Sequence, residues 1–361
     1  MEQREIACRG CLLGLAVGDA MGYTVDKKSW AEICQDYGPN GLLGYDLANG
    51  YAEITSYTQL AAFACNSLLL GVARGNQERY EKYIALGLRE WLKGQQYRGD
   101  EKTFCWLVRV PEMRHRHCMD TRLVDALCRE TLGTPEMPIF KSDNPGSISV
   151  PIAVGLLYDK AWMAPQLVGK LGTQAVAFTH GNKESFLAGA VLAYVIAGIV
   201  QHPDKPLALQ FSQAVQAMQT QFGETYGEAE TVAKLMFRAM EFAKDTELNA
   251  LAAMSMLECT TAAECLAGAM YACLIHPANF DEAVIAAVNH SGRSAAVGAL
   301  TGAILGAKLG VEALPDFYLE CLEPAGVLGE LAEDVAQGRQ VMQLFDPDWE
   351  QKYAQGRPVN R

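Results

Sequence analysis

The chain has 361 residues, of which 50% are hydrophobic, and its formal net charge is −12. That length fits one large domain or two average ones, and the apolar content is enough for a sizeable core. The acidic balance argues against a nucleic-acid partner, because binding to a phosphate backbone depends on clustered Lys and Arg side chains. It leaves room for a small anionic ligand, since helix N-termini and loop amides bind phosphates without net positive charge.

Apolar residues recur at three- and four-residue spacing along most of the chain, and few stretches alternate with period two. The pattern predicts helices over residues 5–22, 58–74, 78–93, 121–131, 150–158, 164–178, 183–200, 206–221, 228–243, 247–257, 261–275, 280–290 and 294–309. We interpret residues 97–120, where the local charge is positive, as a solvated loop. We predict an all-α fold, a single compact helical bundle domain over residues 1–361, with a core at about 5–322 and a C-terminal extension at 323–361.

Two of the predicted helices are unusually rich in small residues. Glycines follow one another at four-residue spacing in residues 10–22 and again in residues 298–306. Each Gly inside a helix costs about 0.5–1 kcal/mol relative to Ala. Such a cost is offset where two helix backbones approach closely, so the pattern predicts tight helix crossings.

The cysteines and the apolar runs bear on the cellular compartment. Eleven cysteines are scattered, and Cys8 and Cys11 form one C-x-x-C spacing, which we interpret as two thiols on a buried helix face rather than a zinc or redox site. The N-terminus does not have the form of a signal peptide, so we expect a reducing, cytoplasmic location. The longest apolar run, from Phe186 to Val200, is shorter than the ~20 residues of a membrane span, and we expect no membrane partner.

Several blocks in the chain share the order of motifs in one enzyme family. They are Gly10–Gly22 (Gly-x-x-x-Gly-x-x-x-Gly-Asp-Ala-x-Gly), Thr55–Gln59, Asn144–Ile152, Phe178–Asn182, Phe280–Asn289 and Ser291–Ala296. Together they resemble the ADP-ribosylglycohydrolase family, the dinitrogenase reductase-activating glycohydrolases included, over most of residues 5–322. The resemblance implies an all-α fold and hydrolysis of the N- or O-glycosidic bond between ADP-ribose and a protein side chain.

The resemblance also implies a dinuclear magnesium site built from four aspartates, an Asp pair in the first segment and an Asp-x-Asp in the last. The matching positions in this chain hold Ser56, Tyr57, Arg293 and Ala295. Magnesium requires oxygen ligands, mostly carboxylates. Ser and Tyr offer uncharged hydroxyls, Ala offers nothing, and the guanidinium carries a permanent positive charge. We therefore expect no metal ligands and no cofactor.

Two carboxylates remain as catalytic candidates. Asp19 ends an otherwise apolar helix, where a charge is costly unless it has a partner. Asp26 falls at the spacing where some members of the family carry a catalytic Glu, so the resemblance implies a general acid or base there. The carboxylate of Asp is one methylene shorter, and proton transfer needs contact within about 3 Å. The alternative for Asp19 is a structural residue that caps or holds a loop. The alternative for Asp26 is a surface residue beside Lys27 and Lys28.

The same resemblance points to residues on the ligand side of a cleft, and Arg293 is the most informative of them. Its guanidinium binds anions such as pyrophosphate bidentately, so it could take the place of a metal. Alternatively, it pairs with Asp19, Asp26 or Glu53 and fills the cleft. The candidate ligand-binding residues are Ser56, Tyr57, Thr58, Asn144, Gly146, Ser147, His180, Arg293 and Ser294.

These observations leave three hypotheses for the function. The first is a catalytically impaired ADP-ribosylglycohydrolase-like protein, a pseudoenzyme that binds ADP-ribose or an ADP-ribosylated partner or regulates it. The second is an active hydrolase of a similar glycosidic bond that uses a metal-independent or non-standard site. The third is a structural helical protein whose cleft is closed. The loss of all four carboxylates in two distant segments favours the first, and the sequence leaves the oligomeric state open.

Overall fold

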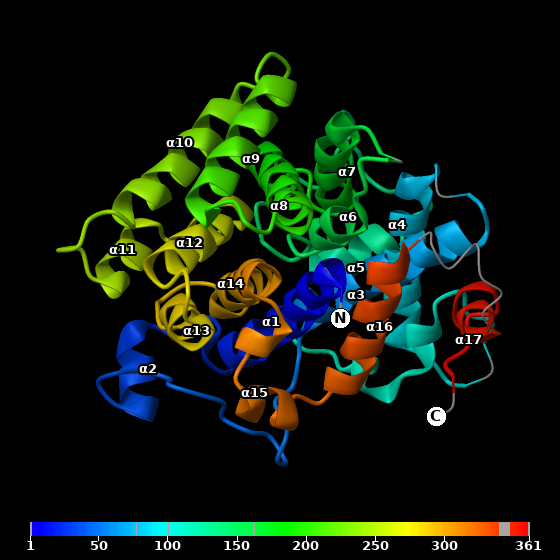
Figure 1. Cartoon of the computed structure of the whole chain (residues 1–361), viewed down its shortest axis with the longest axis horizontal. Coiled ribbons are helices and arrows are strands. Elements are labelled where there is room, and N and C mark those ends of the chain that lie inside the picture. Colours follow the sequence, from blue (N-terminus) through cyan, green and yellow to red (C-terminus); the bar gives the residue numbers. More distant parts are fainter. Residues whose placement is uncertain (1, 77, 100, 162, 339–346, 360–361) are drawn as a thin grey trace.

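The computed structural model describes residues 2–76, 78–99, 101–161, 163–338 and 347–359. Over these residues the chain forms helices and no strand, and its β-type pairing consists of two isolated bridges, Ala48 with Tyr51 and Ala52 with Leu322. The helices pack around a common centre, with α9, α10 and α11 on one side of the molecule and α4 and α17 on the other (Figure 1). The predicted all-α fold is confirmed.

The helices follow the apolar periodicity closely. They are α1 (Gln3–Val25), α2 (Trp30–Tyr37), α3 (Ser56–Ala73), α4 (Tyr80–Gly94), η1 (Trp106–Arg109), η2 (Pro111–Arg114), α5 (Thr121–Leu127), α6 (Pro151–Leu157), α7 (Pro165–Ala177), α8 (Lys183–Gln201), α9 (Leu207–Phe222), α10 (Glu228–Phe242), α11 (Ala250–Met256), α12 (Ala262–Ile275), α13 (Phe280–Val288), α14 (Ser294–Leu309), η3 (Val311–Ala313), α15 (Asp316–Cys321), α16 (Ala325–Gln337), α17 (Pro347–Trp349) and η5 (Glu350–Ala354). Each predicted range matches a helix within a few residues. The short α2, α15 and α17 and the longer α16 were not predicted.

The two glycine-rich helices, α1 and α14, lie side by side at the centre of the molecule (Figure 1). Their glycines face each other in antiparallel pairs: Gly10 with Gly306, Gly14 with Gly302, and Gly18 with Gly298. A Cβ added to Gly18 would lie 1.9 Å from the carbonyl oxygen of Gly298, so any side chain there would separate the backbones. The predicted tight crossing is confirmed. It brings the C-terminus of α1 next to the N-terminus of α14.

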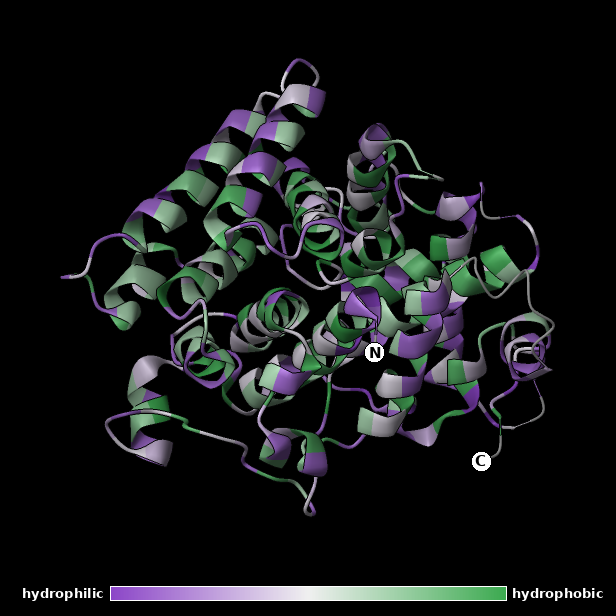
Figure 2. Ribbon diagram, in the orientation of Figure 1, coloured by the Kyte–Doolittle hydropathy of each residue, from purple (hydrophilic) through white to green (hydrophobic). Residues whose placement is uncertain are grey.

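The other helices complete a single apolar core (Figure 2). By length and composition α8 could cross a membrane, but 78% of its most apolar window is buried in this protein, and it packs on α6, α7 and α9. Cys8 and Cys11 are fully buried on α1. α16 packs on α1, and its Leu328 and Leu331 are fully buried, so the apolar core continues beyond residue 322.

Candidate functional site

Asp19, near the end of α1, holds the N-terminus of α3. Its Oδ1 accepts a hydrogen bond from the hydroxyl of Thr55 (2.6 Å). Its Oδ2 accepts from the backbone N–H groups of Thr55 (2.9 Å) and Thr58 (3.1 Å) and from the Thr58 hydroxyl (2.6 Å). Burial raises the pKa of Asp19 to about 6, against the opposing effect of these hydrogen bonds. Both oxygens are occupied, so the geometry is that of a helix cap, and the predicted ligand contact Thr58 is part of it.

Asp26, the residue that follows α1, contacts the N-terminus of α14 in a similar way. Its Oδ1 accepts a hydrogen bond from the backbone N–H of Ala295 (3.2 Å), in the first turn of α14. Its Oδ2 lies 3.5 Å from Nε of Arg293 and 3.8 Å from the thiol of Cys118. A carboxylate at a helix N-terminus is favoured by the helix dipole. The side chain is 5% exposed, so this second carboxylate lies just beneath the surface.

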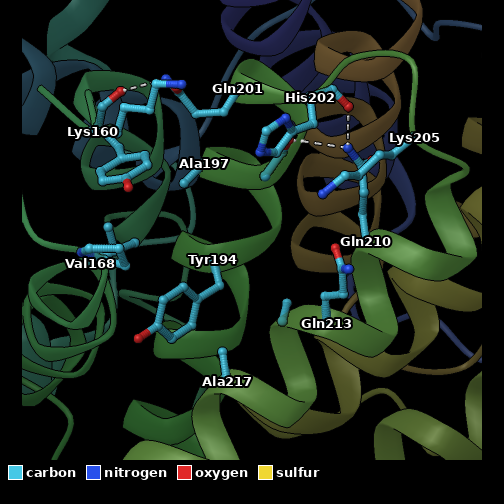
Figure 3. Close-up of a pocket in the computed structure, with 14 residues that line it drawn as sticks. Lys160, Val168, Tyr194, Ala197, Gln201, His202, Lys205, Gln210, Gln213 and Ala217 are labelled. Atoms are coloured by element: carbon cyan, nitrogen blue, oxygen red, sulfur yellow. Dashed lines mark hydrogen bonds between the residues drawn. The ribbon is translucent and has the colours of Figure 1, made fainter.

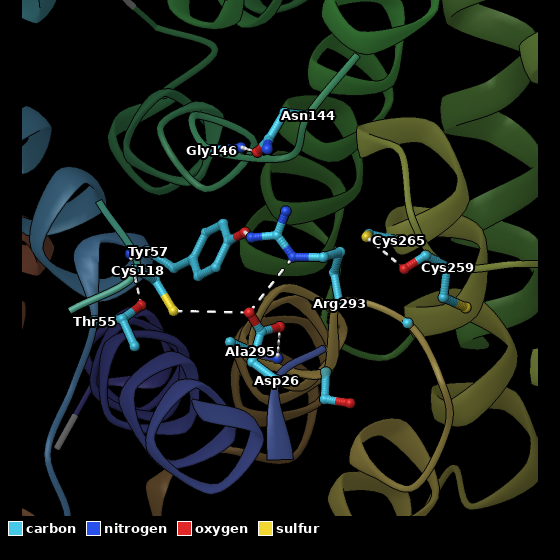
Figure 4. Close-up of polar contacts among 12 residues, drawn as sticks. Asp26, Thr55, Tyr57, Cys118, Asn144, Gly146, Cys259, Cys265, Arg293 and Ala295 are labelled. Carbon is cyan, nitrogen blue, oxygen red and sulfur yellow. Dashed lines mark hydrogen bonds and ion pairs between the residues drawn. The ribbon is translucent and has the colours of Figure 1, made fainter. Parts of the chain in front are cut away.

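Arg293 extends across this junction toward α3 (Figure 4). Its Nη2 donates to the hydroxyl of Tyr57 (3.3 Å), and its Nε faces Asp26. Burial works against the charge, but the neighbouring Tyr57 and Asp26 raise the pKa of Arg293, so the guanidinium stays charged with its side chain 14% exposed. Of the three partners that the sequence allowed, the structure selects Asp26, because Asp19 is occupied by threonines and Glu53 lies 3.3 Å from His117.

Contacts within the loop before α14 fix the position of the Arg293 backbone. The backbone N–H of Arg293 donates to the carbonyl of Cys259 (2.8 Å), and a Cβ at Gly292 would lie 2.6 Å from the same oxygen. Only glycine therefore allows this close approach. Nδ1 of His290 accepts from the N–H of Gly292 (2.9 Å), and burial lowers the pKa of His290 to about 4. Ser294, a predicted ligand contact, is buried and donates to the carbonyl of His290 (3.4 Å).

The residues present do not fit a dinuclear magnesium site. The hydroxyl of Ser56 donates to the carbonyl of Cys118 (3.0 Å), and burial raises the pKa of Tyr57 well above 10, so its hydroxyl stays protonated. Arg293 places a positive charge between Tyr57 and Asp26. Across the described ranges, no group of three or more His, Cys, Asp or Glu side chains is arranged to hold a metal ion. A hard divalent cation needs several carboxylate oxygens, and this donor set does not offer them.

A second polar group is centred on His180. Its Nε2 lies 3.0 Å from Oδ2 of Asp120, and its Nδ1 lies 2.9 Å from the hydroxyl of Ser147 and 2.8 Å from that of Thr179. Burial raises the pKa of Asp120, but the hydrogen bond and charge of His180 outweigh it and leave the pKa below its usual value. His180 and Ser147 have no exposed surface, so their contacts fit a positioning role for the loop that contains Ser147.

That loop carries the two remaining candidates. Asn144 accepts a hydrogen bond at Oδ1 from the N–H of Gly146 (2.9 Å), and a Cβ at Gly146 would lie 3.1 Å from Nε2 of His180. In the view of Figure 4, Asn144 and Gly146 lie on the opposite side of the Arg293 guanidinium from Asp26. The structure thus gathers Asp26, Tyr57 and Arg293 into one contact group and leaves His180 and Asp19 in two separate buried groups.

Two residues of these groups, Cys118 and Asp120, and the neighbouring His117 come from the stretch 97–120 and were not among the candidates. Cys118 contacts Asp26, Asp120 contacts His180, and Nδ1 of His117 lies 2.8 Å from the hydroxyl of Tyr23. The interpretation of this stretch as a solvated loop is wrong, because Cys105–Val108 and Met113 are buried and Cys118 and Asp120 are partly buried. The local positive charge favoured a solvated loop, whereas the apolar run Cys105–Val108 was a sequence signal of burial that this interpretation overlooked.

The sequence of this all-α bundle matches the model of one known protein family. The sequence model of that family, ADP-ribosylglycohydrolase, matches residues 2–344, and the chain belongs to this family. An uncharacterized protein of Archaeoglobus fulgidus is 26% identical over 333 residues, which cover 90% of this chain and 94% of the relative.

Among solved structures, one described as an ADP-ribosylglycohydrolase-related protein complex superposes with a TM-score of 0.57 at 20% identity. The match covers 94% of this chain and 100% of that chain. At this level of identity the likeness concerns the fold. It agrees with the helical architecture described above and adds no residue role.

Proposed function

We propose that this member of the ADP-ribosylglycohydrolase family is a catalytically impaired binding or regulatory protein, which binds ADP-ribose or an ADP-ribosylated partner without a metal ion. The observation that carries the proposal is the guanidinium of Arg293, held by Asp26 and Tyr57 where the resemblance expects a magnesium ligand. The choice of ADP-ribose as the ligand rests on the family.

Charge and geometry support an anion site of this kind. The guanidinium has fixed, forked N–H donors that match phosphate oxygens, so one arginine can supply part of the positive charge that a metal would bring. Arg293 is largely buried but still 14% exposed, and an ion pair is stronger where water is partly excluded. A phosphate or another anion would compete with Asp26 for the same donors.

The carboxylates support impaired rather than normal hydrolysis. Both oxygens of Asp19 accept hydrogen bonds inside the bundle, and the side chain has no exposed surface. Asp26 has one oxygen on the Ala295 N–H and the other beside Arg293. A general acid or base must come within about 3 Å of the proton that it transfers, and neither carboxylate presents a free oxygen.

Calorimetric titration of ADP-ribose into the purified full chain, with magnesium or with a chelator, tests the proposal. We expect equal affinity under both conditions, no release of ribose from an ADP-ribosylated substrate, and loss of most affinity in Arg293→Met. Affinity that requires magnesium would contradict the proposal. Absence of binding to the wild type would also contradict it and favour the structural hypothesis. Hydrolysis that disappears in Asp26→Asn would favour the metal-independent hydrolase.

A further inference from the structure

Exposed apolar side chains gather where the segment between α2 and α3 runs beside α15, at the lower edge of the molecule in Figure 1. The two segments touch, because the rings of Tyr45 and Tyr318 pack edge-on with their centres 4.9 Å apart and the backbones of Ala52 and Leu322 pair. Seven large apolar side chains are exposed in the described residues, and four of them lie on these two segments: Leu43, Leu47, Tyr51 and Phe317. Exposed apolar side chains that cluster in this way mark an interaction surface.

The charged side chains of these two segments all have the same sign. Residues 38–53 and 310–337 contain no Lys, Arg or His, and their exposed carboxylates are those of Asp46, Glu312, Asp316 and Glu320. Lys28 reaches this region from the turn before α2, but its Nζ pairs with Asp36 (2.8 Å). The surface of residues 42–53 and 311–323, which we call the acidic half, is therefore apolar and negatively charged.

The stretch between α4 and α5 carries the opposite charge. Residues 93–120 contain six Lys or Arg and four Asp or Glu. Two of these carboxylates have partners of their own, because Asp120 faces His180 (3.0 Å) and Glu101 accepts the N–H of Arg98 (3.0 Å). Residues 102–119 keep four Lys or Arg against Glu112 alone, and the adjacent segment 347–359 adds two acidic and two basic side chains. The excess of positive charge remains after the nearby carboxylates are counted.

Three arginines in this stretch are fixed in place without an anionic partner. The guanidinium carbons of Arg109 and Arg114 lie 5.6 and 5.3 Å from the centre of the Tyr97 ring. Nε of Arg116 donates to the backbone carbonyl of Gln95 (3.2 Å). In the part of the chain that the structure describes, the arginines that pair with carboxylates are on α1 and at the start of α14, and none of these three does. Tyr97 and the three arginines form what we call the cationic half.

The two halves adjoin along two histidine–glutamate contacts. Nε2 of His115 lies 3.1 Å from Oε2 of Glu323, and Nε2 of His117 lies 3.3 Å from Oε2 of Glu53. The two imidazole rings stack with their centres 5.6 Å apart. Both glutamates belong to the acidic half, whereas the histidines alternate in the sequence with arginines of the cationic half. The molecule thus has one face on which an acidic, apolar half and a cationic half lie side by side.

A second copy of the chain fits this face by symmetry. A two-fold axis near the histidine–glutamate contacts places the cationic half of each copy against the acidic half of the other, so that one operation forms both contacts. Opposite charges then face each other twice. Guanidiniums also pack on exposed aromatic rings, such as those of Tyr51 and Phe317. A foreign partner would need the same two halves in the same arrangement.

We propose that this face is the interface of a two-fold symmetric homodimer, in which Arg109, Arg114 and Arg116 of one copy contact the acidic half of the other. The pocket of about 320 Å³ between α7, α8 and α9 shares no residue with the face (Figure 3). The proposal does not depend on ADP-ribose binding near Arg293.

Sedimentation equilibrium of the purified full chain tests the oligomeric state. We expect a mass twice the 39.3 kDa of one chain. The dissociation constant should rise at least about tenfold between ~0.1 M and ~1 M salt, because the screening length falls from ~10 to ~3 Å. A monomer at about 100 μM protein would overturn the proposal. A mass that grows beyond the dimer would overturn the closed two-fold arrangement, and a salt-independent dimer would overturn the pairing of charges.

Charge reversal tests which surfaces meet. The double variant Arg109→Glu, Arg114→Glu makes both halves acidic, and Asp316→Lys, Glu320→Lys makes both cationic, so we expect each of them alone to be monomeric. Mixed in equal amounts, the two variants are complementary again and should form a heterodimer. Misfolding cannot produce such a rescue. A double variant that stays dimeric, or a mixture that stays monomeric, would overturn the proposal.

Matched controls separate the face from the rest of the surface. Lys160→Glu with Lys234→Glu changes the net charge as much as the arginine reversal does, at exposed positions outside the face, and should remain dimeric. Phe317→Ser removes an exposed ring from the acidic half and should weaken the dimer at least about tenfold. Met137→Ser, an exposed methionine outside the face, should leave the dissociation constant unchanged. Equal effects of the two serine variants would overturn the assignment to this face.

Discussion

Asp19 and Asp26 lie two helical turns apart on the same end of α1, and each receives the N-terminus of another helix. Asp19 contacts neutral donors only and has no exposed surface, so its contacts join α1 to the N-terminus of α3 and are structural. Oδ1 of Asp26 accepts a hydrogen bond from a single backbone N–H, and its Oδ2 faces the charged Arg293 near the surface. The comparison teaches that aspartates two turns apart can be a fully buried structural tie and, under the proposed function, an exchangeable ion pair near the surface.

The largest expected effect is on the Asp19 side of the comparison. Asp19→Ala leaves the buried backbone N–H groups of Thr55 and Thr58 without acceptors, at about 1–3 kcal/mol each. We expect the free energy of unfolding to fall by about 4 kcal/mol, measured by urea denaturation. Asp19→Asn keeps one acceptor and should cost clearly less. If Asp19→Ala and Asp26→Ala cost the same, the distinction between the two carboxylates is wrong.

A pH-dependent effect is expected in the loop that leads to Arg293. The pKa of His290 is about 4 in the folded protein and about 6.5 in an unfolded chain. Between these values the unfolded chain binds a proton that the folded protein does not, so the free energy of unfolding falls as the pH falls. The difference reaches about 3 kcal/mol at pH 4.

The variant His290→Asn tests this cause. Its side-chain oxygen can still accept the N–H of Gly292, but it does not titrate. Urea denaturation of the variant and the wild type at pH 7 and at pH 4 should show that the wild type loses about 3 kcal/mol more over this range. Other titrating groups, Asp19 included, cancel in the difference. A parallel loss in both proteins would show that His290 is not the acid-sensitive group.

The ion pair itself should have a smaller effect on stability and a larger one on binding. Asp26→Asn keeps an acceptor for the N–H of Ala295 and removes the charge that faces Arg293. We expect a loss of about 1–2 kcal/mol in the free energy of unfolding, because Arg293 is partly exposed and water replaces part of the interaction. The affinity for ADP-ribose should rise severalfold, since the anion no longer competes with Asp26. A lower affinity in calorimetry would contradict the exchangeable role.

Much of the fold was predictable because its signals are local and repeated. The apolar and glycine periodicity of Ser294–Leu309 gave the bounds of α14. The missed α2 also has a local signal, the capping box of Ser29 and Glu32, which is too short to show in a periodicity argument. For α16, the buried Leu328 and Leu331 stand at helical spacing, so this helix was also predictable from the sequence.

The site was less predictable because its contacts join distant segments. The sequence narrowed the partner of Arg293 to three carboxylates, but the choice depends on the register of α1 against α14, which the facing glycines set. The pairing of His180 with Asp120 depends on how an irregular segment folds back over α3. The periodicity of apolar residues does not predict how an irregular segment folds. Sequence spacing identified Asp26, Tyr57 and Arg293 as candidates, but it missed Cys118 and Asp120, and only the tertiary packing shows which side chains contact one another.

The smallest expected effect concerns the hydroxyl that completes the Arg293 group. Tyr57→Phe removes the acceptor of one Arg293 N–H, a bond of 3.3 Å, and should lower the free energy of unfolding by about 0.5–1 kcal/mol. Tyr45→Phe is the matched control, because the Tyr45 hydroxyl is buried without a partner and its removal should cost nothing or stabilise the fold. Equal costs in urea denaturation would mean that the Tyr57 hydroxyl only fills space. A cost confined to Tyr57→Phe would show that α3 helps to hold the guanidinium, and would place the exchangeable pair among three helices rather than two.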